Sequence, residues 1–151
     1  MNGTRKILLV EDNLADAYLT KHVLNSGTVE CDIQVVHDGE AAINYLLNRE
    51  NGIQIPDLVI LDLNLPKKDG REVLKEIKNH PKLRRIPVLV YSTSSAVIDI
   101  SQCYDLHANC YYKKPFHLDD LILILRSVEQ DWLKFAQLPT KDALEVHTTV
   151  S

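Results

Sequence analysis

Short, wholly apolar runs that end abruptly in polar residues are the feature that most constrains how this chain can fold. Residues 7–10, 58–61 and 88–91 contain no charged side chain. A strand without alternation of apolar and polar residues is expected to be buried on both faces of its sheet. Each run is followed by a segment in which apolar residues recur at helical spacing. Parallel strands covered by helices on both faces satisfy these conditions, so the sequence predicts an α/β protein.

The same strand and helix pattern occurs five times along the chain. The expected strands are residues 7–10, 33–36, 58–61, 88–91 and 110–112. Asn13, Asp38 and Asp69 are suited to cap the helices that follow the first three strands, and Gly27 is suited to end the first helix. The last helix is expected over residues 118–135. This pattern predicts a doubly wound sheet of five parallel strands, in the order 2-1-3-4-5, with five helices.

Length and composition predict one small domain. The chain has 151 residues, of which 45% are hydrophobic and 25% are charged. We expect the domain to span residues 1–138, and residues 139–151, which are polar and unpatterned, to form a flexible tail. The net charge of −4 disfavours binding to nucleic acid, and no apolar run approaches the roughly 20 residues that cross a membrane. Three cysteines without CxxC pairing, and no secretion signal, predict a cytoplasmic protein.

Polar side chains follow four of the five expected strands. They are Glu11 and Asp12, then Asp62, Ser92 and Lys114. Ligands of doubly wound sheets bind outside the carboxyl ends of the strands, so we expect these groups to share one crevice. Carboxylates that crowd together raise one another's pKa unless a cation compensates, and Mg²⁺ takes oxygen ligands. The sequence therefore predicts Mg²⁺ bound by Asp12, Asp62 and the backbone carbonyl of Asn64.

A carboxylate beside Mg²⁺ is suited to accept a phosphoryl group. Phosphoryl transfer depends mainly on positioning and on neutralisation of charge. Asp62 would be the nucleophile, Lys114 would pair with one phosphoryl oxygen, and Ser92 would donate a hydrogen bond to another. The interpretation depends on all of these groups together, because a lone acid after a strand is equally suited to cap a helix.

The ordered set Glu11-Asp12, Asp62, Ser92 and Lys114-Pro115-Phe116 resembles the receiver domain of two-component response regulators, over residues 5–135. The segments LDLNLPKKDGREVLKEIK and HANCYYKK, and the lack of an output domain, are similar to the small response regulators paired with cyanobacterial phytochromes. The resemblance implies a flavodoxin-like fold and transfer of a phosphoryl group to Asp62 from a sensor histidine kinase, here a phytochrome. It also implies that Glu11 contributes to the Mg²⁺ site through water.

The resemblance further implies a conformational switch. Ser92 would move towards the phosphoryl group, and Tyr111, three residues before Lys114, would turn inward. The sequence departs from the commonest family pattern, because Ser92 stands where Thr is more frequent and Thr93 where a small residue is usual. Looser coupling to Tyr111 and narrower access to the phosphoryl group are the expected effects. The resemblance also implies a cis Lys114–Pro115 bond, which the residues alone do not indicate.

Two helices carry apolar residues whose spacing predicts the face that each helix buries. In the first helix these residues are Leu14, Tyr18, Leu19 and Val23. In the last helix they are Leu118, Leu121, Ile122, Leu125, Val128 and Trp132. Leu123 falls on the opposite side of the last helix, with Ile124 and Phe135 at the flank. This surplus suits either a wide stripe against a neighbouring helix or a homodimer surface, and we favour the homodimer.

Three other functions fit parts of the pattern. A flavodoxin-like FMN carrier would need a phosphate-binding loop after the first strand, where Glu11 and Asp12 would repel phosphate. An aspartate-nucleophile phosphatase would need an acid two residues after Asp62, where Asn64 stands. A degenerate receiver that acts only as a docking module is the third alternative. We expect a phosphoacceptor rather than an enzyme, although such domains assist their own phosphorylation and slow dephosphorylation.

Overall fold

The computed structural model describes residues 3–49 and 54–139, and within this part of the chain the predicted strand and helix order is present. The strands are β1 (Arg5–Val10), β2 (Cys31–Val36), β3 (Leu58–Leu61), β4 (Val88–Ser92) and β5 (Cys110–Lys113). The helices are α1 (Leu14–Asn25), α2 (Gly39–Leu47), α3 (Gly70–Asn79), α4 (Val97–Asp105) and α5 (Leu118–Val128). A π-helical segment, η1 (Glu129–Phe135), continues α5.

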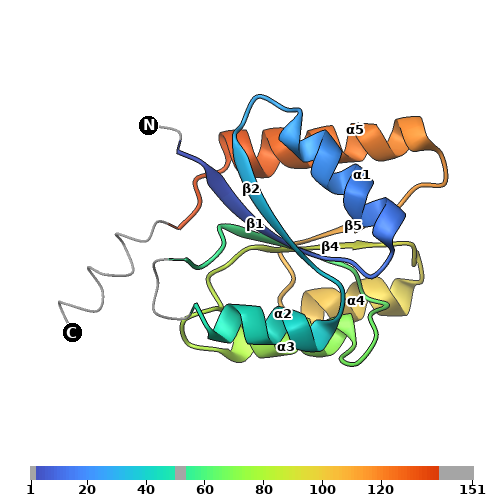
Figure 1. Ribbon diagram of the computed structural model, residues 1–151. Coiled ribbons are helices and arrows are strands. Elements are labelled where there is room, and N and C mark those ends of the chain that lie inside the picture. Colours follow the sequence, from blue (N-terminus) through green and yellow to red (C-terminus); the bar gives the residue numbers. More distant parts are fainter. Residues whose placement is uncertain (1–2, 50–53, 140–151) are drawn as a thin grey trace.

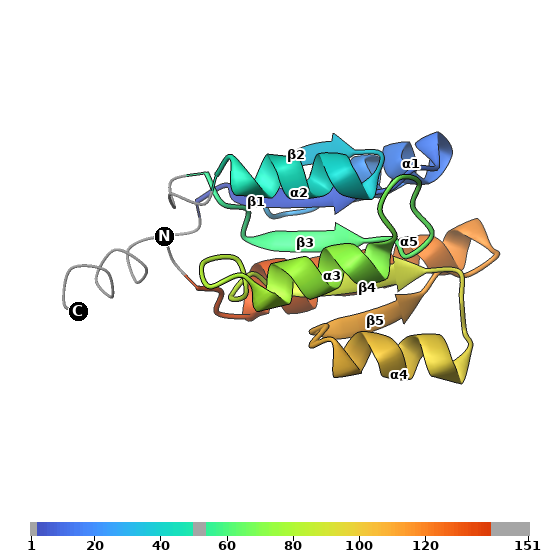
Figure 2. The ribbon, with the colours of Figure 1, turned by 90° about the horizontal axis from the view of Figure 1, so that it is seen from below.

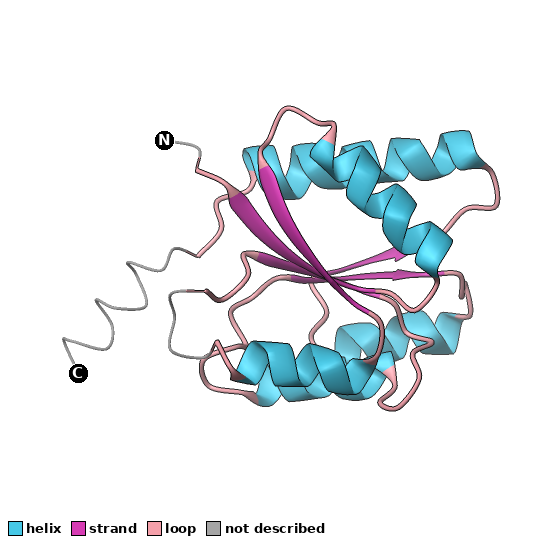
Figure 3. Ribbon diagram, viewed as in Figure 1, coloured by secondary structure: helices cyan, strands magenta, loops and turns pink. Residues whose placement is uncertain are grey.

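The strands form one parallel sheet in the order β2-β1-β3-β4-β5, which confirms the predicted fold class (Figure 2). Helices α1 and α5 cover one face of the sheet, and α2, α3 and α4 cover the other (Figure 1). Figure 3 shows the resulting three layers, with the strands between two layers of helices. The sheet order reverses between β1 and β3, so the carboxyl ends of these strands border the crevice in which doubly wound proteins bind ligands.

The sheet divides the core into two halves. Leu8 and Val10 of β1 pack with residues of α2, α3 and α4, whereas Ile7 and Leu9 pack with residues of α1 and α5. Strand β3 lies at the centre of the sheet, and all four of its residues are buried. Burial on both faces explains why its sequence shows no polar alternation, and it gives a rigid support to the residue that follows, Asp62.

The predicted helix caps are confirmed. The side chain of Asn13 accepts a hydrogen bond from the amide of Asp16 at 3.0 Å, and Asp38 accepts one from Ala41 at 2.7 Å. Asp69 caps α3 by accepting from the amide of Arg71 at 3.0 Å. Each cap satisfies a backbone donor that the first turn of the helix leaves unpaired.

The predicted buried face of α1 is partly wrong. Leu14 and Tyr18 are 70% and 74% exposed, whereas Ala17, Thr20, Val23 and Leu24 are buried. Both sets recur at helical intervals and share Val23, but the buried face is turned about the helix axis towards Ala17, Thr20 and Leu24. Because Ala and Thr are small, this face lets α1 approach the sheet closely, which apolar spacing alone does not reveal.

The last helix extends through Phe135 as predicted, but its final part is π-helical. The amide of Ala136 donates to the carbonyl of Asp131 at 3.0 Å, which is an i to i+5 bond. A wider turn shifts the rotation of all later residues. Leu133 is therefore buried where Trp132 was expected, and Trp132 is only half-buried. Leu118 was also placed wrongly, because it is 57% exposed at the first turn of α5.

Gly27 and Gly70 both lie in close contact with neighbouring groups, a side chain in the first case and backbone in the second. The predicted helix end at Gly27 is nearly correct, since α1 ends at Asn25 with Ser26 as its cap. A Cβ at Gly27 would overlap the buried carboxylate of Glu129, so the glycine also makes room for η1. A Cβ at Gly70 would overlap the backbone of Asp62 and Leu63. Gly70 thus lets α3 begin directly against the loop that carries Asp62.

Substitution of Gly70 by alanine should lower the free energy of unfolding by about 1–3 kcal/mol, because the backbone that the new methyl group meets cannot move aside as a flexible side chain could. Urea denaturation measures this change. Gly3→Ala is the control, since no atom lies within 4 Å of the position that its Cβ would take. Equal stability of the Gly70→Ala and Gly3→Ala variants would contradict the packing argument.

Two predictions concern parts of the chain that the structure describes only partly. Residues 140–151 of the predicted tail lie outside the described ranges, so the tail and the domain boundary at residue 138 stay predictions.

None of the described helices is long and apolar enough to span a bilayer.

A crevice of carboxylates and lysine at the sheet edge

The residues predicted from the strand ends do lie at one edge of the sheet. Glu11 follows β1, Asp62 follows β3, Ser92 ends β4, and Lys114 follows β5. These four strands are neighbours and parallel, and the register pairs Leu61 with Val90 and Ser92 with Lys113. The folded chain therefore brings together groups that are up to 103 residues apart in sequence.

Three carboxylates meet in this crevice. Glu11, Asp12 and Asp62 each have a carboxylate oxygen within 4.8 Å of the others. Glu11 and Asp62 are buried, whereas Asp12 is exposed. Burial, and then a hydrogen bond with Asp62, raise the pKa of Glu11 to about 8, although the ammonium of Lys114 acts in the opposite direction. The crevice therefore gathers more carboxyl groups than its one buried lysine can pair with.

Lys114 is the cation of the crevice. Its ammonium forms a close ion pair with Glu11 and lies 3.2 Å from Asp16 and 3.6 Å from Asp62. The side chain is buried, and its Nζ lies 5.3 Å from the centre of the Tyr91 ring. Burial lowers the pKa of Lys114, but the hydrogen bond with Glu11 and the surrounding carboxylates outweigh it and raise the pKa above its usual value. Lys114 is thus held charged beside Asp62.

Asp16 is a site residue that the sequence analysis missed. It lies in the first turn of α1, and one of its carboxylate oxygens accepts a hydrogen bond from Lys114 at 3.2 Å. An acid in the first turn of a helix normally needs no explanation beyond the helix dipole. Its position in the sequence could have indicated the role, because the helix after β1 begins at the same sheet edge as Asp12 and its first turn therefore lies beside the crevice.

Ser92 and Asn64 follow the central strands of the sheet, Ser92 as the last residue of β4 and Asn64 in the loop after β3. Ser92 is fully buried, and its Oγ accepts a hydrogen bond from the amide of Ser94 at 3.3 Å. Thr93 beside it is exposed. Asn64 lies two residues after Asp62 in the loop that follows β3, and its side chain is exposed. The predicted ligand of Mg²⁺ at this residue is the backbone carbonyl, not the side chain.

Tyr111 contacts the loop between β4 and α4. The ring packs against the half of the core that contains α2, α3 and α4, and its hydroxyl donates to the carbonyl of Ser94 at 2.8 Å. The predicted cis bond between Lys114 and Pro115 is wrong, because the described chain has no cis peptide bond. The trans form is the more stable isomer of most X–Pro bonds.

Residues 7–126 match the family described as the response regulator receiver domain. This chain belongs to that receiver family. The match covers strands β2 to β5 in full, β1 from residue 7 onward, and every residue of the crevice, which confirms the resemblance inferred from the strand ends.

One relative is similar to this receiver over nearly its whole length. Response regulator Rcp1 of Synechocystis sp. is 45% identical over 141 residues, which cover 91% of this receiver and 95% of Rcp1. The crystal structure of the Mn²⁺-bound form of Rcp1 has a TM-score of 0.83 and covers 90% of this receiver and 99% of that chain.

Two further solved structures are informative. The phosphorylated cyanobacterial phytochrome response regulator RcpA is 48% identical, with a TM-score of 0.87, and covers 91% of this receiver and 100% of that chain. The receiver domain of sensor histidine kinase PA1611 from Pseudomonas aeruginosa, which has Mg²⁺ coordinated in its active-site cleft, is 29% identical, with a TM-score of 0.66. It covers 87% of this receiver and 98% of that chain.

Proposed function

We propose that this receiver is a phosphoacceptor switch that takes a phosphoryl group on Asp62 from the phosphohistidine of a sensor kinase. The observation that carries the proposal is the position of the Lys114 ammonium, which lies 3.6 Å from Asp62 and also pairs with Glu11 and Asp16. A carboxylate oxygen of Asp62 forms a bond to phosphorus while the P–N bond of the donor breaks and its electron pair stays on the imidazole. Lys114 neutralises one phosphoryl oxygen, and Ser92 donates a hydrogen bond to another.

The same crevice fits a divalent cation, and we propose Mg²⁺. Clustered carboxylate oxygens are the donor set that a hard cation requires. A bound cation would also offset the repulsion between these carboxylates. Asp12, Asp62 and the carbonyl of Asn64 would hold the ion, and Glu11 would act through water. When bound, the ion neutralises charge on the phosphoryl group. The structures of Rcp1 with Mn²⁺ and of the PA1611 receiver with Mg²⁺ support this part of the proposal.

The proposed donor is a phytochrome histidine kinase in the cytoplasm. RcpA, which is described as a cyanobacterial phytochrome response regulator, is 48% identical to this receiver, and the similarity extends over 91% of the chain. The receiver is expected to occupy residues 1–138, to bind no nucleic acid, and to have no catalytic turnover beyond assisting its own phosphorylation and slow dephosphorylation.

Signalling is proposed to involve Ser92 and Tyr111. Ser92 ends β4, and its Oγ is linked to the same loop residue, Ser94, that accepts the Tyr111 hydroxyl. Movement of one of these side chains would therefore shift Ser94 and, through it, the other side chain. We propose that occupancy of Asp62 is transmitted along this route to the surface formed by α4 and β5.

The alternatives fit less well. A docking module without phosphorylation has no need for a buried lysine beside a buried aspartate. Burial of both charges lowers the stability of the fold, and docking alone gives no reason to retain them. An FMN carrier is disfavoured by the carboxylates after β1, which would repel its phosphate. A phosphatase is disfavoured because Asn64 takes the place of its second acid.

Incubation of the receiver with acetyl phosphate and Mg²⁺ tests the function, because it supplies the phosphoryl group without a kinase. Intact-mass spectrometry should show the addition of one phosphoryl group, and omission of Mg²⁺ should suppress it. A wild-type protein that gains no phosphoryl group from acetyl phosphate, and none from a phosphorylated phytochrome kinase, would leave the docking module as the better explanation.

A homodimer is also proposed, through the outer face of α5 and η1. Leu123 and Phe135 are 67% and 66% exposed, which is more apolar surface than a helix of a monomer needs. Sedimentation should show a dimer, and Leu123→Glu should shift it to monomer while the subunit stays folded, because the side chain is largely exposed within one subunit. Sedimentation of the wild type as a monomer at high concentration, with and without a phosphoryl mimic, would contradict the dimer.

A further inference from the structure

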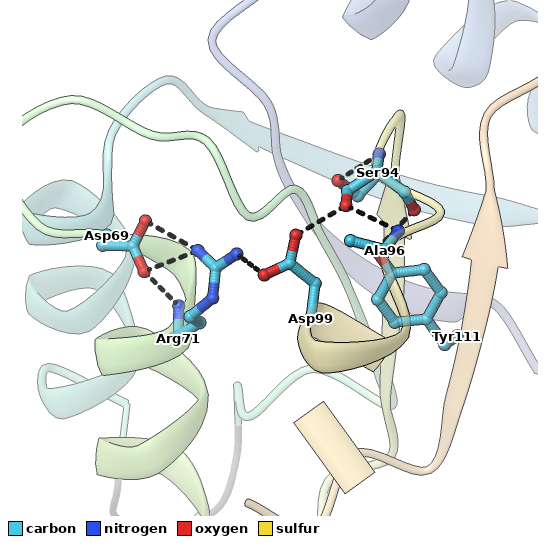
Figure 4. A network of polar contacts seen from close by, with 7 residues as sticks. Asp69, Arg71, Ser94, Ala96, Asp99 and Tyr111 are labelled. Atoms are coloured by element: carbon cyan, nitrogen blue, oxygen red, sulfur yellow. Dashed lines mark hydrogen bonds and ion pairs between the residues drawn. The ribbon is translucent and has the colours of Figure 1, made fainter. Parts of the chain in front are cut away.

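A polar network outside the carboxylate crevice links α3, α4 and β5 through the loop between β4 and α4 (Figure 4). Arg71 of α3 donates from Nη2 to Oδ1 of Asp99 at 2.8 Å. The other carboxylate oxygen of Asp99, on α4, accepts the hydroxyl of Ser94 at 2.6 Å. The carbonyl of Ser94 accepts the hydroxyl of Tyr111 at 2.8 Å. The network therefore ends on the residue proposed to switch.

Ser94 is the junction of this network. Its amide donates to Oγ of Ser92 at 3.3 Å, and its own Oγ accepts from the amide of Ala96 at 3.3 Å while donating to Asp99. With the bond from Tyr111, every polar group of Ser94 is engaged. A change in the position of Asp99 therefore reaches both Ser92 and Tyr111 through one residue.

Arg71 fixes Asp99 from the other side. The Nη1 atom of Arg71 lies 3.2 and 3.3 Å from the carboxylate oxygens of Asp69, which caps α3. The side chains of Arg71 and Asp99 are only 22% and 24% exposed, so water and salt screen their ion pair less than a pair on the open surface. The hydrogen bond from Ser94, followed by that from Arg71, lowers the pKa of Asp99 and keeps it a charged acceptor.

The network joins the two loops that the phosphoryl group would touch. Asp69 and Arg71 stand at the end of the loop that begins with Asp62, and Gly70 packs directly on the backbone of Asp62. Ser94 stands two residues after Ser92. A Ser92 oxygen that accepts from the Ser94 amide keeps its own proton to donate to a phosphoryl oxygen.

We propose that Asp99, held by Arg71, is a positioning residue that fixes Ser94 and so stabilises the arrangement in which Tyr111 is bound to the loop and Ser92 presents its hydroxyl to a phosphoryl group on Asp62. This inference rests on the proposed phosphoacceptor function. It goes beyond that function because it makes the α3–α4 ion pair, which touches neither the phosphoryl group nor the metal ligands, a determinant of phosphoryl recognition.

Titration with beryllofluoride, a phosphoryl mimic that binds carboxylates, tests the proposal in the presence of Mg²⁺. Asp99→Ala should weaken beryllofluoride binding about tenfold, as expected for the loss of hydrogen bonds to a charged group. Arg71→Gln should weaken it less, and the double variant should be no weaker than Asp99→Ala because Arg71 acts through Asp99. Asp105→Ala, which removes an exposed carboxylate of the same helix, should bind like the wild type.

Two further measurements separate positioning from general damage. The affinity for Mg²⁺ alone should be unchanged in Asp99→Ala, because the proposed metal ligands lie outside the network. Amide hydrogen exchange at Ser94 and Ala96, measured without any phosphoryl group, should be faster in Asp99→Ala because both amides donate within the network. Asp99→Asn retains an acceptor for Ser94 and should fall between Asp99→Ala and the wild type.

The outcomes are distinguishable. Unchanged beryllofluoride affinity in Asp99→Ala, or equal losses of beryllofluoride and Mg²⁺ affinity, would overturn the positioning role while the wild type still binds the mimic. A wild type that binds Mg²⁺ but no beryllofluoride would instead overturn the proposed phosphoacceptor function, and the positioning role with it. Additive effects of Arg71→Gln and Asp99→Ala would contradict the claim that Arg71 acts through Asp99.

Discussion

Replacement of Asp62 by asparagine should abolish phosphoryl labelling of this receiver by acetyl phosphate and Mg²⁺. An amide oxygen is too weak a nucleophile to displace acetate, whereas the shape of the side chain is kept. The remaining carboxylates do not substitute for it, because Glu11 is engaged by Lys114 and Asp12 lies at the exposed rim of the crevice. The expected decrease is at least about 100-fold, well within the losses that follow removal of a covalent nucleophile.

The measurement is intact-mass spectrometry over a time course, with the modified residue located by peptide mapping. Asp32→Asn is the matched control, because Asp32 is an exposed aspartate on β2, away from the crevice. The control should be labelled like the wild type. Equal labelling of wild type and Asp62→Asn would show that another group accepts the phosphoryl group, and thermal unfolding of both proteins would exclude misfolding as the cause of a loss.

The sequence was sufficient to predict the sheet and its functional edge. Runs such as residues 58–61 are apolar because β3 is buried on both faces, and Asp62 interrupts the run because the strand ends there. Since parallel strands end at the same edge, Glu11, Asp62 and Lys114 could be brought together without coordinates. These predictions used only local pattern and one topological rule, both of which the chain obeys.

Other features depend on rotations and distances that local pattern does not contain. Tyr18 and Ala17 are both acceptable on a buried face of α1, and only the available space selects Ala17. The π-helical turn after Val128 changes which residue of η1 is buried, and nothing in the spacing of apolar residues indicated it. Arg71 and Asp99 are 28 residues apart on separate helices, so their pairing was visible only once the sheet order had placed α3 beside α4.

The role of Lys114 was only half predicted. The sequence suggested a cation for a phosphoryl oxygen, but in the structure Lys114 also bonds to Glu11 and Asp16. The same ammonium therefore compensates the carboxylates and faces Asp62. A cation added to the crevice would take over part of that compensation, which makes the metal and the lysine parts of one charge balance.

The charge balance predicts opposite effects of Asp12→Asn with and without Mg²⁺. Loss of one carboxylate ligand should weaken Mg²⁺ binding at least about tenfold. At a Mg²⁺ concentration 100 times the wild-type dissociation constant, the ion adds about 2.7 kcal/mol to the free energy of unfolding of the wild type, and about 1.4 kcal/mol to that of a tenfold weaker variant. The variant should therefore be less stable than the wild type when Mg²⁺ is present.

In EDTA the same variant should be slightly more stable than the wild type, because a negative charge within 4.8 Å of Glu11 and Asp62 has been removed. The gain should be below about 1 kcal/mol because Asp12 is exposed. Isothermal titration with Mg²⁺ and thermal unfolding with Mg²⁺ or EDTA measure the two effects, and Asp32→Asn again serves as control. The reversal of sign is the informative result, because a variant that merely damages the fold is less stable in both buffers. An equal gain from Mg²⁺ in wild type and Asp12→Asn would exclude Asp12 as a ligand of the ion.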